Sequence, residues 1–138
     1  MRQIKFRGKS NTGEWVYGSL VYSENIHPAI YFETGKGNIK SLEWVYVDPE
    51  TVGQFTGLTD KNGKEIYEGD ILKYDTGKHY VVVYSTEGLD SNTNDFYIGA
   101  FMLKDDHGFH ELICSVTRPY KYAEIIGNIH DNPDLLTK

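Results

Sequence analysis

Short runs of aromatic and β-branched residues, separated by clusters of Gly, Asn and Asp, are the feature that most limits what this chain can fold into. Branched and aromatic side chains pack well on a pleated sheet, so such runs are typical of strands. The clearest run is residues 80–84, Tyr-Val-Val-Val-Tyr, which has no polar side and predicts a strand covered on both faces. We expect strands near residues 4–7, 15–22, 29–32, 39–47, 53–55, 71–74, 80–84, 96–103, 110–115 and 122–129.

The connections between these runs also favour hairpins. Residues 10–13 join two strand patterns at hairpin length, and the Asn62-Gly63 pair favours a tight reversal because both residues tolerate positive φ. Residues 86–94 predict an exposed loop, and only residues 132–136 have a helical cap pattern. The sequence therefore predicts an all-β fold of mainly antiparallel strands with at most one or two short helices.

The length of 138 residues predicts one domain over residues 1–138. A strand pattern stops at Pro49, which suggests a subdivision into N-terminal strands (residues 1–50) and a second part (residues 51–138). No apolar run approaches the ~20 residues that span a bilayer, and the start MRQIKFRGK lacks the apolar core of a signal peptide. We expect a cytoplasmic protein with no membrane partner.

The net charge of −6 conceals an uneven distribution. Arg2, Lys5, Arg7 and Lys9 give the first nine residues a charge of +4, so the rest of the chain carries −10. An acidic surface repels phosphate backbones, and the composition therefore disfavours a nucleic-acid partner. If nucleic acid is bound at all, the basic first strand is where we expect the contact.

Residues 47–74 form the most specific segment, VDPETVGQFTGLTDKNGKEIYEGDILKY. Together with the flanking elements RQIKFRG, WVYGSL and EIIGNIHDNPDLL, in this order, the segment resembles the YopX family of phage and prophage proteins. The resemblance runs from the first residues to the last. It implies a small, soluble, mostly β protein that a phage or prophage encodes and that works in the bacterial cytoplasm, and it brings no established reaction or catalytic residue.

The residues of this motif have a structural interpretation of their own. We expect structural roles, in turns, for Gly57, Asn62, Gly63, Glu68, Gly69 and Asp70. A Gly-Asp pair ahead of the apolar strand at residues 71–74 resembles the entry strand of small SH3-like barrels, in which the aspartate bonds nearby backbone amides. By this analogy we predict an SH3-like small barrel in the C-terminal part of the chain, over residues 53–129.

Catalytic and metal chemistry have little support in the sequence. Residues 105–111, with Asp105, Asp106, His107, His110 and Glu111, form a local group of metal-ligand types, but their spacing matches no ligand motif and is typical of a hairpin turn. The single cysteine, Cys114, lies in an apolar run that indicates burial. We predict no enzyme, no catalytic residue, no cofactor and no metal.

The aromatic residues give the strongest functional hypothesis. Eleven Tyr and two Trp exceed what the core of a small barrel can hold, and Tyr and Trp are enriched at protein interfaces. We predict a non-enzymatic phage accessory protein that self-assembles or binds a host or phage protein. The alternative is an SH3-like nucleic-acid module that uses Arg2, Lys5, Arg7 and Lys9 as a basic strip beside exposed tyrosines. The candidate binding residues are Arg2, Lys5, Arg7, Trp15 and Tyr17. The surplus lies mainly in one third of the chain, at Trp15, Tyr17, Tyr22, Tyr31, Trp44 and Tyr46.

Overall fold

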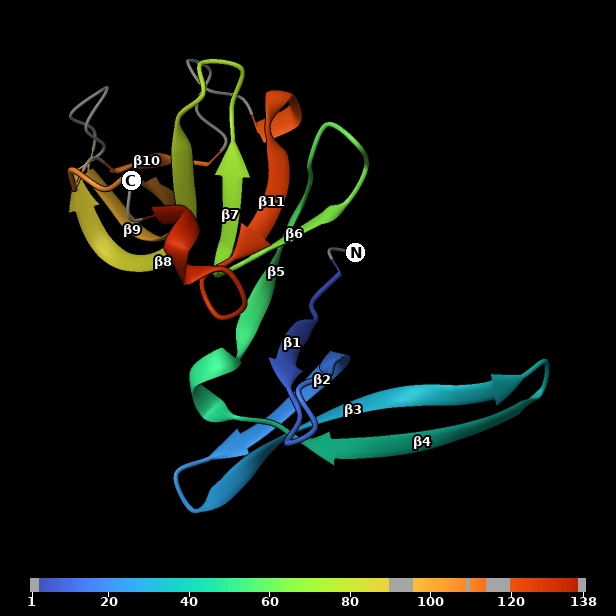
Figure 1. Ribbon diagram of the computed structural model, residues 1–138. Coiled ribbons are helices and arrows are strands. Elements are labelled where there is room, and N and C mark those ends of the chain that lie inside the picture. Colours follow the sequence, from blue (N-terminus) through green and yellow to red (C-terminus); the bar gives the residue numbers. More distant parts are fainter. Residues whose placement is uncertain (1–2, 90–95, 109, 114–119, 137–138) are drawn as a thin grey trace. The chain divides into compact units, whose positions relative to one another are not determined.

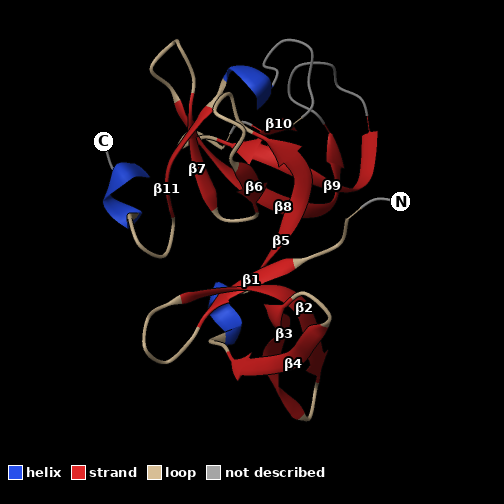
Figure 2. Cartoon of the chain, turned by 90° about the vertical axis from the view of Figure 1, so that its right-hand side faces the viewer, coloured by secondary structure: helices blue, strands red, loops and turns tan. Residues whose placement is uncertain are grey.

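The computed structural model describes residues 3–89, 96–108, 110–113 and 120–136 of the chain. It confirms the predicted all-β fold: antiparallel strands make up two sheets (Figures 1 and 2). The strands are β1 (Phe6–Lys9), β2 (Trp15–Ser23), β3 (Ile26–Lys36), β4 (Ile39–Tyr46), β5 (Gly53–Thr59), β6 (Glu65–Tyr67), β7 (Asp70–Lys73), β8 (His79–Leu89), β9 (Phe96–Lys104), β10 (His110–Leu112) and β11 (Glu124–Asn128).

The helical segments are single 3-10 turns: η1 (Pro49–Thr51), η2 (Tyr120–Tyr122) and η3 (Pro133–Leu136). The described residues thus hold three short helices where the sequence predicted one or two. The side chain of Asp48 caps η1 by accepting the backbone N–H of Glu50 at 3.0 Å. In the described part of the chain, no helix has the length and apolarity that a membrane span requires.

The chain divides into two compact units, Met1–Phe55 and Thr56–Lys138. The seam that the sequence suggests after residue 50 falls within η1, and the division itself lies a few residues later, inside β5. In the first sheet the strand order is β4-β3-β2-β1-β5-β6. β1 to β4 are hairpin neighbours along the chain, and β1 also pairs with the start of β5.

The first unit has a small core. Ile30 and Val47 are almost completely buried, and Ala29 and Phe55 are nearly so. The strands approach closely at Gly18, where any side chain would overlap the carbonyl oxygen of Tyr31. With so few buried side chains, the first unit leaves much of its sheet open to solvent.

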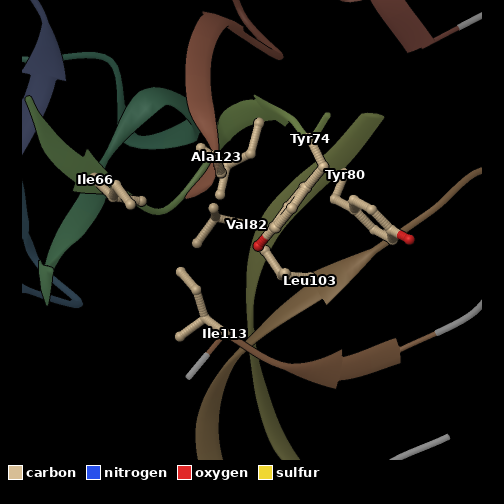
Figure 3. Close-up of a cluster of buried hydrophobic side chains, with 8 residues drawn as sticks. Ile66, Tyr74, Tyr80, Val82, Leu103, Ile113 and Ala123 are labelled. Carbon is tan, nitrogen blue, oxygen red and sulfur yellow. The ribbon is translucent and has the colours of Figure 1, made fainter. Parts of the chain in front are cut away.

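The second unit has the larger core. Its sheet has the order β10-β9-β8-β7-β11. Figure 3 shows the buried cluster, in which side chains from β7, β8 and β9 meet others from β6 and from the segment before β11. The members of the cluster are Ile66, Leu72, Tyr74, Tyr80, Val82, Leu103, Ile113 and Ala123.

The strand at residues 80–84 is not covered on both faces, contrary to the prediction. Tyr80 and Val82 are fully buried, but Val81 and Val83 are half-buried and Tyr84 is 49% exposed. One face of β8 lines the core of this unit, and the other face remains partly in solvent. β8 also continues through Leu89, which makes the start of the predicted loop at residues 86–94 a strand.

β6 is the strand that the sequence did not predict. It has only three residues, too few for an alternating pattern to be recognised. A turn at Gly69, with φ of +92°, separates it from β7. The carboxylate of the buried Asp70 accepts the backbone N–H of Tyr67 at 2.7 Å, and the carbonyl of Gly69 accepts the N–H of Ile129 at 2.9 Å.

Asp60 connects the turn between β5 and β6 to β11. Its Oδ1 accepts the backbone N–H groups of Asn62 and Lys64, both at 2.9 Å, and its Oδ2 accepts that of Ile125 at 3.0 Å. Burial alone would raise the pKa of Asp60, but the N–H donors of Ile125, Lys64 and Asn62, with the charge of Lys64, hold the pKa below its usual 3.8. The folded state therefore favours the ionised form of the Asp60 carboxyl group.

We expect Asp60→Asn to lower the free energy of unfolding near neutral pH by about 1–3 kcal/mol, because an amide cannot accept at both ends and leaves one buried N–H unsatisfied. A lowered pKa in the folded state stabilises the fold above the unfolded-state pKa, and this contribution is lost as the pH falls through the folded-state pKa. The difference between variant and wild type should therefore shrink below pH 3.8. Urea denaturation at neutral and acidic pH measures it.

Asp75→Asn is the matched control, since Asp75 is exposed in the turn between β7 and β8. It should unfold like the wild type at both pH values. A stability difference for Asp60→Asn that stays constant between neutral and acidic pH would contradict the proposed role of the charge.

Candidate protein-interaction surface

The hairpin of β3 and β4 is the most exposed regular element of the first unit. Figure 1 shows its two strands as a long ribbon. Their register is continuous from the pair Ala29–Tyr46 to the pair Lys36–Ile39, without a bulge. Every residue of β4 is exposed except the half-buried Val45. Much of the hairpin thus contributes little to the core.

Four rings along this hairpin contact one another. Trp44 lies opposite Tyr31 in the register, and the two rings stack with their centroids 6.2 Å apart. The Tyr46 and Trp44 rings form a T-shaped pair with centroids 4.8 Å apart, and the His27 and Tyr46 rings form another with centroids 5.3 Å apart. We call His27, Tyr31, Trp44 and Tyr46 the hairpin aromatic cluster. Trp44 is 49% exposed and Tyr46 is 53% exposed, so the cluster presents aromatic faces to solvent.

Further apolar side chains extend this surface. Directly opposed residues in antiparallel strands point to the same side of the sheet. Val21, which pairs with Ala29, and Leu42, which pairs with Glu33, therefore share the side of the aromatic cluster. Both side chains are exposed. Tyr17 is also exposed and shares this side, because it lies two positions before Ser19, the pairing partner of Tyr31. These side chains add exposed apolar area to the side of the sheet that carries the aromatic cluster.

The basic first strand lies against aromatic rings. The Arg7 guanidinium carbon is 4.6 Å from the centroid of the Trp15 ring, and Lys9 Nζ is 5.7 Å from it. Lys5 Nζ lies 5.2 Å from the Phe55 ring. The structure thus brings Arg7 together with Trp15 and with Tyr17, its pairing partner on β2. Arg7 is only 5% exposed, so most of the accessible charge of this strand is on Lys5 and Lys9, and Arg2 lies outside the described residues.

The motif residues occupy turns and buried positions. Gly57 and Gly63 have φ of +85° and +80°, a region that favours glycine. Asn62 donates its backbone N–H to Asp60. Glu68, half-buried, precedes Gly69, and Asp70 is buried. These positions lie in the second unit, away in sequence from the hairpin aromatic cluster.

The group of metal-ligand types at residues 105–111 is partly described. Asp105 accepts the backbone N–H of His107 at 2.9 Å, and His107 Nε2 lies 3.6 Å from an Asp106 oxygen on the exposed turn. Glu111 is fully buried on β10. Within the described residues, no three His, Cys, Asp or Glu side chains converge as a metal site would require. Cys114 and the side chain of His110 lie outside the described part of the chain.

The described residues line a surface hollow in each unit. The first, of about 640 Å³, borders the hairpin and is lined by Trp15, Tyr17, Phe32 and Val45 together with the turn between β1 and β2. The second, of about 310 Å³, lies beside His79, whose Nδ1 is 3.1 Å from the carbonyl oxygen of Leu135. By the register, Phe32 and Val45 lie on the opposite side of the sheet from Tyr31 and Trp44, so this hollow is not part of the hairpin aromatic cluster.

Sequence reasoning identified Tyr17, Tyr31, Trp44 and Tyr46 as surplus aromatic residues, and it missed His27 and Leu42. His27 and Leu42 belong to the exposed side only because of the strand register. The alternation of residues 39–46 was the available signal, since it places Leu42 on the same side as Trp44 and Tyr46.

We expect Trp44→Ala to cost only about 1 kcal/mol of folding stability, because half of the side chain is exposed and aromatic pairs contribute ~0.5–1.5 kcal/mol. Ile30→Ala, at a fully buried position of the same unit, should cost about 2–5 kcal/mol. Urea denaturation of both variants checks the difference. Equal losses would mean that the hairpin aromatic cluster is structural and not reserved for a partner.

Comparisons with known proteins agree with this architecture. The crystal structure of protein EF1440 from Enterococcus faecalis is similar to this chain, with a TM-score of 0.56 and 26% sequence identity over 99% of both chains. A comparison with curated proteins finds no match. The model of the YopX protein family matches residues 5–137, nearly the whole length. The chain belongs to the YopX family.

Proposed function

We propose that this protein is a non-enzymatic accessory protein, encoded by a phage or prophage, that acts by binding another protein through the exposed side of the β3–β4 hairpin. The observation that carries the proposal is the hairpin aromatic cluster, whose Trp44 and Tyr46 rings contact each other and are each about half exposed. Burying these large rings inside the protein would stabilise the fold, so their exposure to solvent calls for an explanation other than folding stability.

The physical properties of the cluster suit a binding surface. Trp and Tyr provide large contact areas and lose few rotatable bonds on binding. In this cluster the rings also limit one another's movement, because Trp44 contacts both Tyr31 and Tyr46. A partner would therefore meet side chains that are already partly ordered, which lowers the entropic cost of association.

The non-enzymatic part of the proposal is supported by the use that the fold makes of its carboxylates. Asp60 and Asp70, the most conspicuous acids of the motif, are buried and accept backbone N–H groups. Asp105 also accepts a backbone N–H, in a turn. Carboxylates engaged in this way hold turns and are not presented to a substrate.

The alternative, a nucleic-acid module that uses the first strand, has less support. Arg7 is 5% exposed and packed against Trp15, so its charge is screened from a phosphate backbone. Lys5 and Lys9 are half-buried and also lie over aromatic rings. Nucleic-acid binders need accessible cations for their salt-dependent affinity.

The test is quantitative affinity capture from lysate of infected or lysogenic bacteria. We expect the double variant Trp44→Ala/Tyr46→Ala to lose a specific partner at least about tenfold relative to wild type, as the loss of two interface aromatic residues predicts. Tyr122→Ala is the matched control, because Tyr122 is 56% exposed and lies in the other unit. Identical capture by the double variant and the wild type would refute the assignment of this surface.

A mobility-shift experiment at low salt distinguishes nucleic-acid binding from the proposed protein binding. We expect no shift of single- or double-stranded oligonucleotides by the wild type, because the acidic chain repels phosphates. A shift that weakens steeply with added salt and disappears in Lys5→Glu/Lys9→Glu would favour nucleic-acid binding by the first strand instead.

A further inference from the structure

The free edges of the two sheets differ in length. Among the described residues, the first sheet ends in β4 and β6 and the second in β10 and β11. β6 and β10 have three residues each and β11 has five, whereas β4 has eight. Short edge strands are one of the means by which proteins prevent pairing with other chains. β4 lacks this protection.

Two other edge protections, a proline and a bulge, are also missing from β4. Its sequence, IKSLEWVY, contains no proline. Its pairing with β3 runs without a register shift, so no bulge turns the edge away. It carries one base, Lys40, and one acid, Glu43, which leaves the strand without net charge. β4 is thus a long, regular and electrically neutral edge.

The register determines which backbone groups this edge offers. The two-residue turn at Gly37 and Asn38 makes Lys36–Ile39 a hydrogen-bonded pair, and such pairs alternate along an antiparallel ladder. The N–H of Val47, which donates to the Pro28 carbonyl at 3.1 Å, belongs to the same odd-numbered series. The backbone N–H and C=O groups of the even-numbered residues therefore point to the open edge: those of Lys40, Leu42, Trp44 and Tyr46.

We propose that β4 pairs antiparallel with β4 of a second copy of this chain, with Leu42 opposite Leu42, to form a symmetric dimer. The inference rests on the proposed function, since it names an occupant for the same hairpin. Outward-pointing groups meet only in registers that pair even-numbered residues with even-numbered ones. Centred on Leu42, these groups bond across the two-fold axis and residues 39–45 of both copies align.

Side-chain chemistry favours this register. Residues that are directly opposed share a side, so Lys40 of each copy meets Trp44 of the other, where a cation–π contact can form. On the opposite side Ser41 meets Glu43, and Ile39 meets Val45. No like charges are opposed, and each of these contacts occurs twice because the dimer is symmetric.

The neighbouring registers are worse. Centring the pair on Glu43 opposes two carboxylates directly, which destabilises a strand pair. Centring the pair on Trp44 aligns only residues 42–46 of the two β4 strands. In that register Lys40 would lie opposite Asp48, which is beyond the end of β4 and whose side chain already caps η1. The Leu42-centred register is the longest that avoids like charges.

Cysteine cross-linking tests the register. In a Cys114→Ser background, we expect Leu42→Cys to form a disulfide-linked dimer under mild oxidation, because hydrogen-bonded antiparallel partners have Cα atoms ~5.5 Å apart, within the range that disulfides bridge. Lys40→Cys is the matched control on the same strand. In the Leu42-centred register the two residues at position 40 are offset by four positions along the strands. Their Cα atoms would be more than ~10 Å apart, so this variant should not cross-link. Preferential cross-linking of Trp44→Cys would overturn the Leu42 register.

Charge exchange tests the contact in solution. Trp44→Lys opposes Lys40 of the second copy twice per dimer, and we expect the dimer dissociation constant to rise at least about tenfold. Adding Lys40→Glu converts both contacts into opposite-charge pairs and should restore most of the affinity. Sedimentation equilibrium measures all three proteins, and Tyr122→Lys, in the other unit, should dimerise like the wild type.

The outcomes separate this inference from the proposed function. A wild type that stays monomeric at all concentrations, or a dimer that Trp44→Lys leaves unchanged, overturns the self-pairing of β4. If capture of another protein is nevertheless lost in Trp44→Ala/Tyr46→Ala, the protein-binding function stands with a foreign occupant. A dimer that cross-links at Leu42→Cys, with no capture by the aromatic cluster, supports self-pairing and removes the foreign partner.

Discussion

The Asp60 carboxylate is the interaction on which the second unit most depends. It is buried, it is ionised, and its two oxygens accept three backbone N–H groups from two segments that are more than sixty residues apart in the chain. A nearby backbone bond, from the N–H of Lys61 to the carbonyl of Ala123 at 2.9 Å, joins the same two segments. One charged side chain thus connects the β5–β6 turn to β11 and helps to enclose the core around Ile66 and Ala123.

The first unit treats its strand edges differently. In the second unit, short edge strands and turn bonds, such as that from Ile129 to Gly69, use many of the backbone groups near the ends of the sheet. The first unit buries few side chains and ends in β4, which is long and exposed. The second unit is therefore built around a large buried core, whereas the first unit has a small core and a long exposed hairpin of β3 and β4. Under the proposed function, stability and binding depend on different residues, so the exposed rings can vary with little effect on folding.

Much of the fold could be predicted from local patterns. Alternating aromatic and branched residues located most strands, and the Asn62-Gly63 pair located a turn, because both signals act over a few neighbouring residues. β6 could not be found, since three residues carry no periodicity. The exposure of Tyr84 and the burial of Arg7 depend on which side of a sheet meets the core, a tertiary property. The SH3-like barrel inferred from Gly69-Asp70 remains a prediction.

The sequence predicted that some aromatic residues would lie on the surface, but it could not predict which of them would gather there. Counting Tyr and Trp indicated that some rings must lie outside a small core, but only the pairing of Tyr31 with Trp44 shows which rings gather. The open edge and the aromatic cluster belong to the same strand, and each limits the other's use. Backbone pairing alone would accept any extended segment, and rings alone would bind many apolar surfaces. Because Trp44 supplies both a ring to the cluster and backbone groups to the edge, the proposed partner would have to satisfy both requirements at once, and the proposed surface would be selective for that reason.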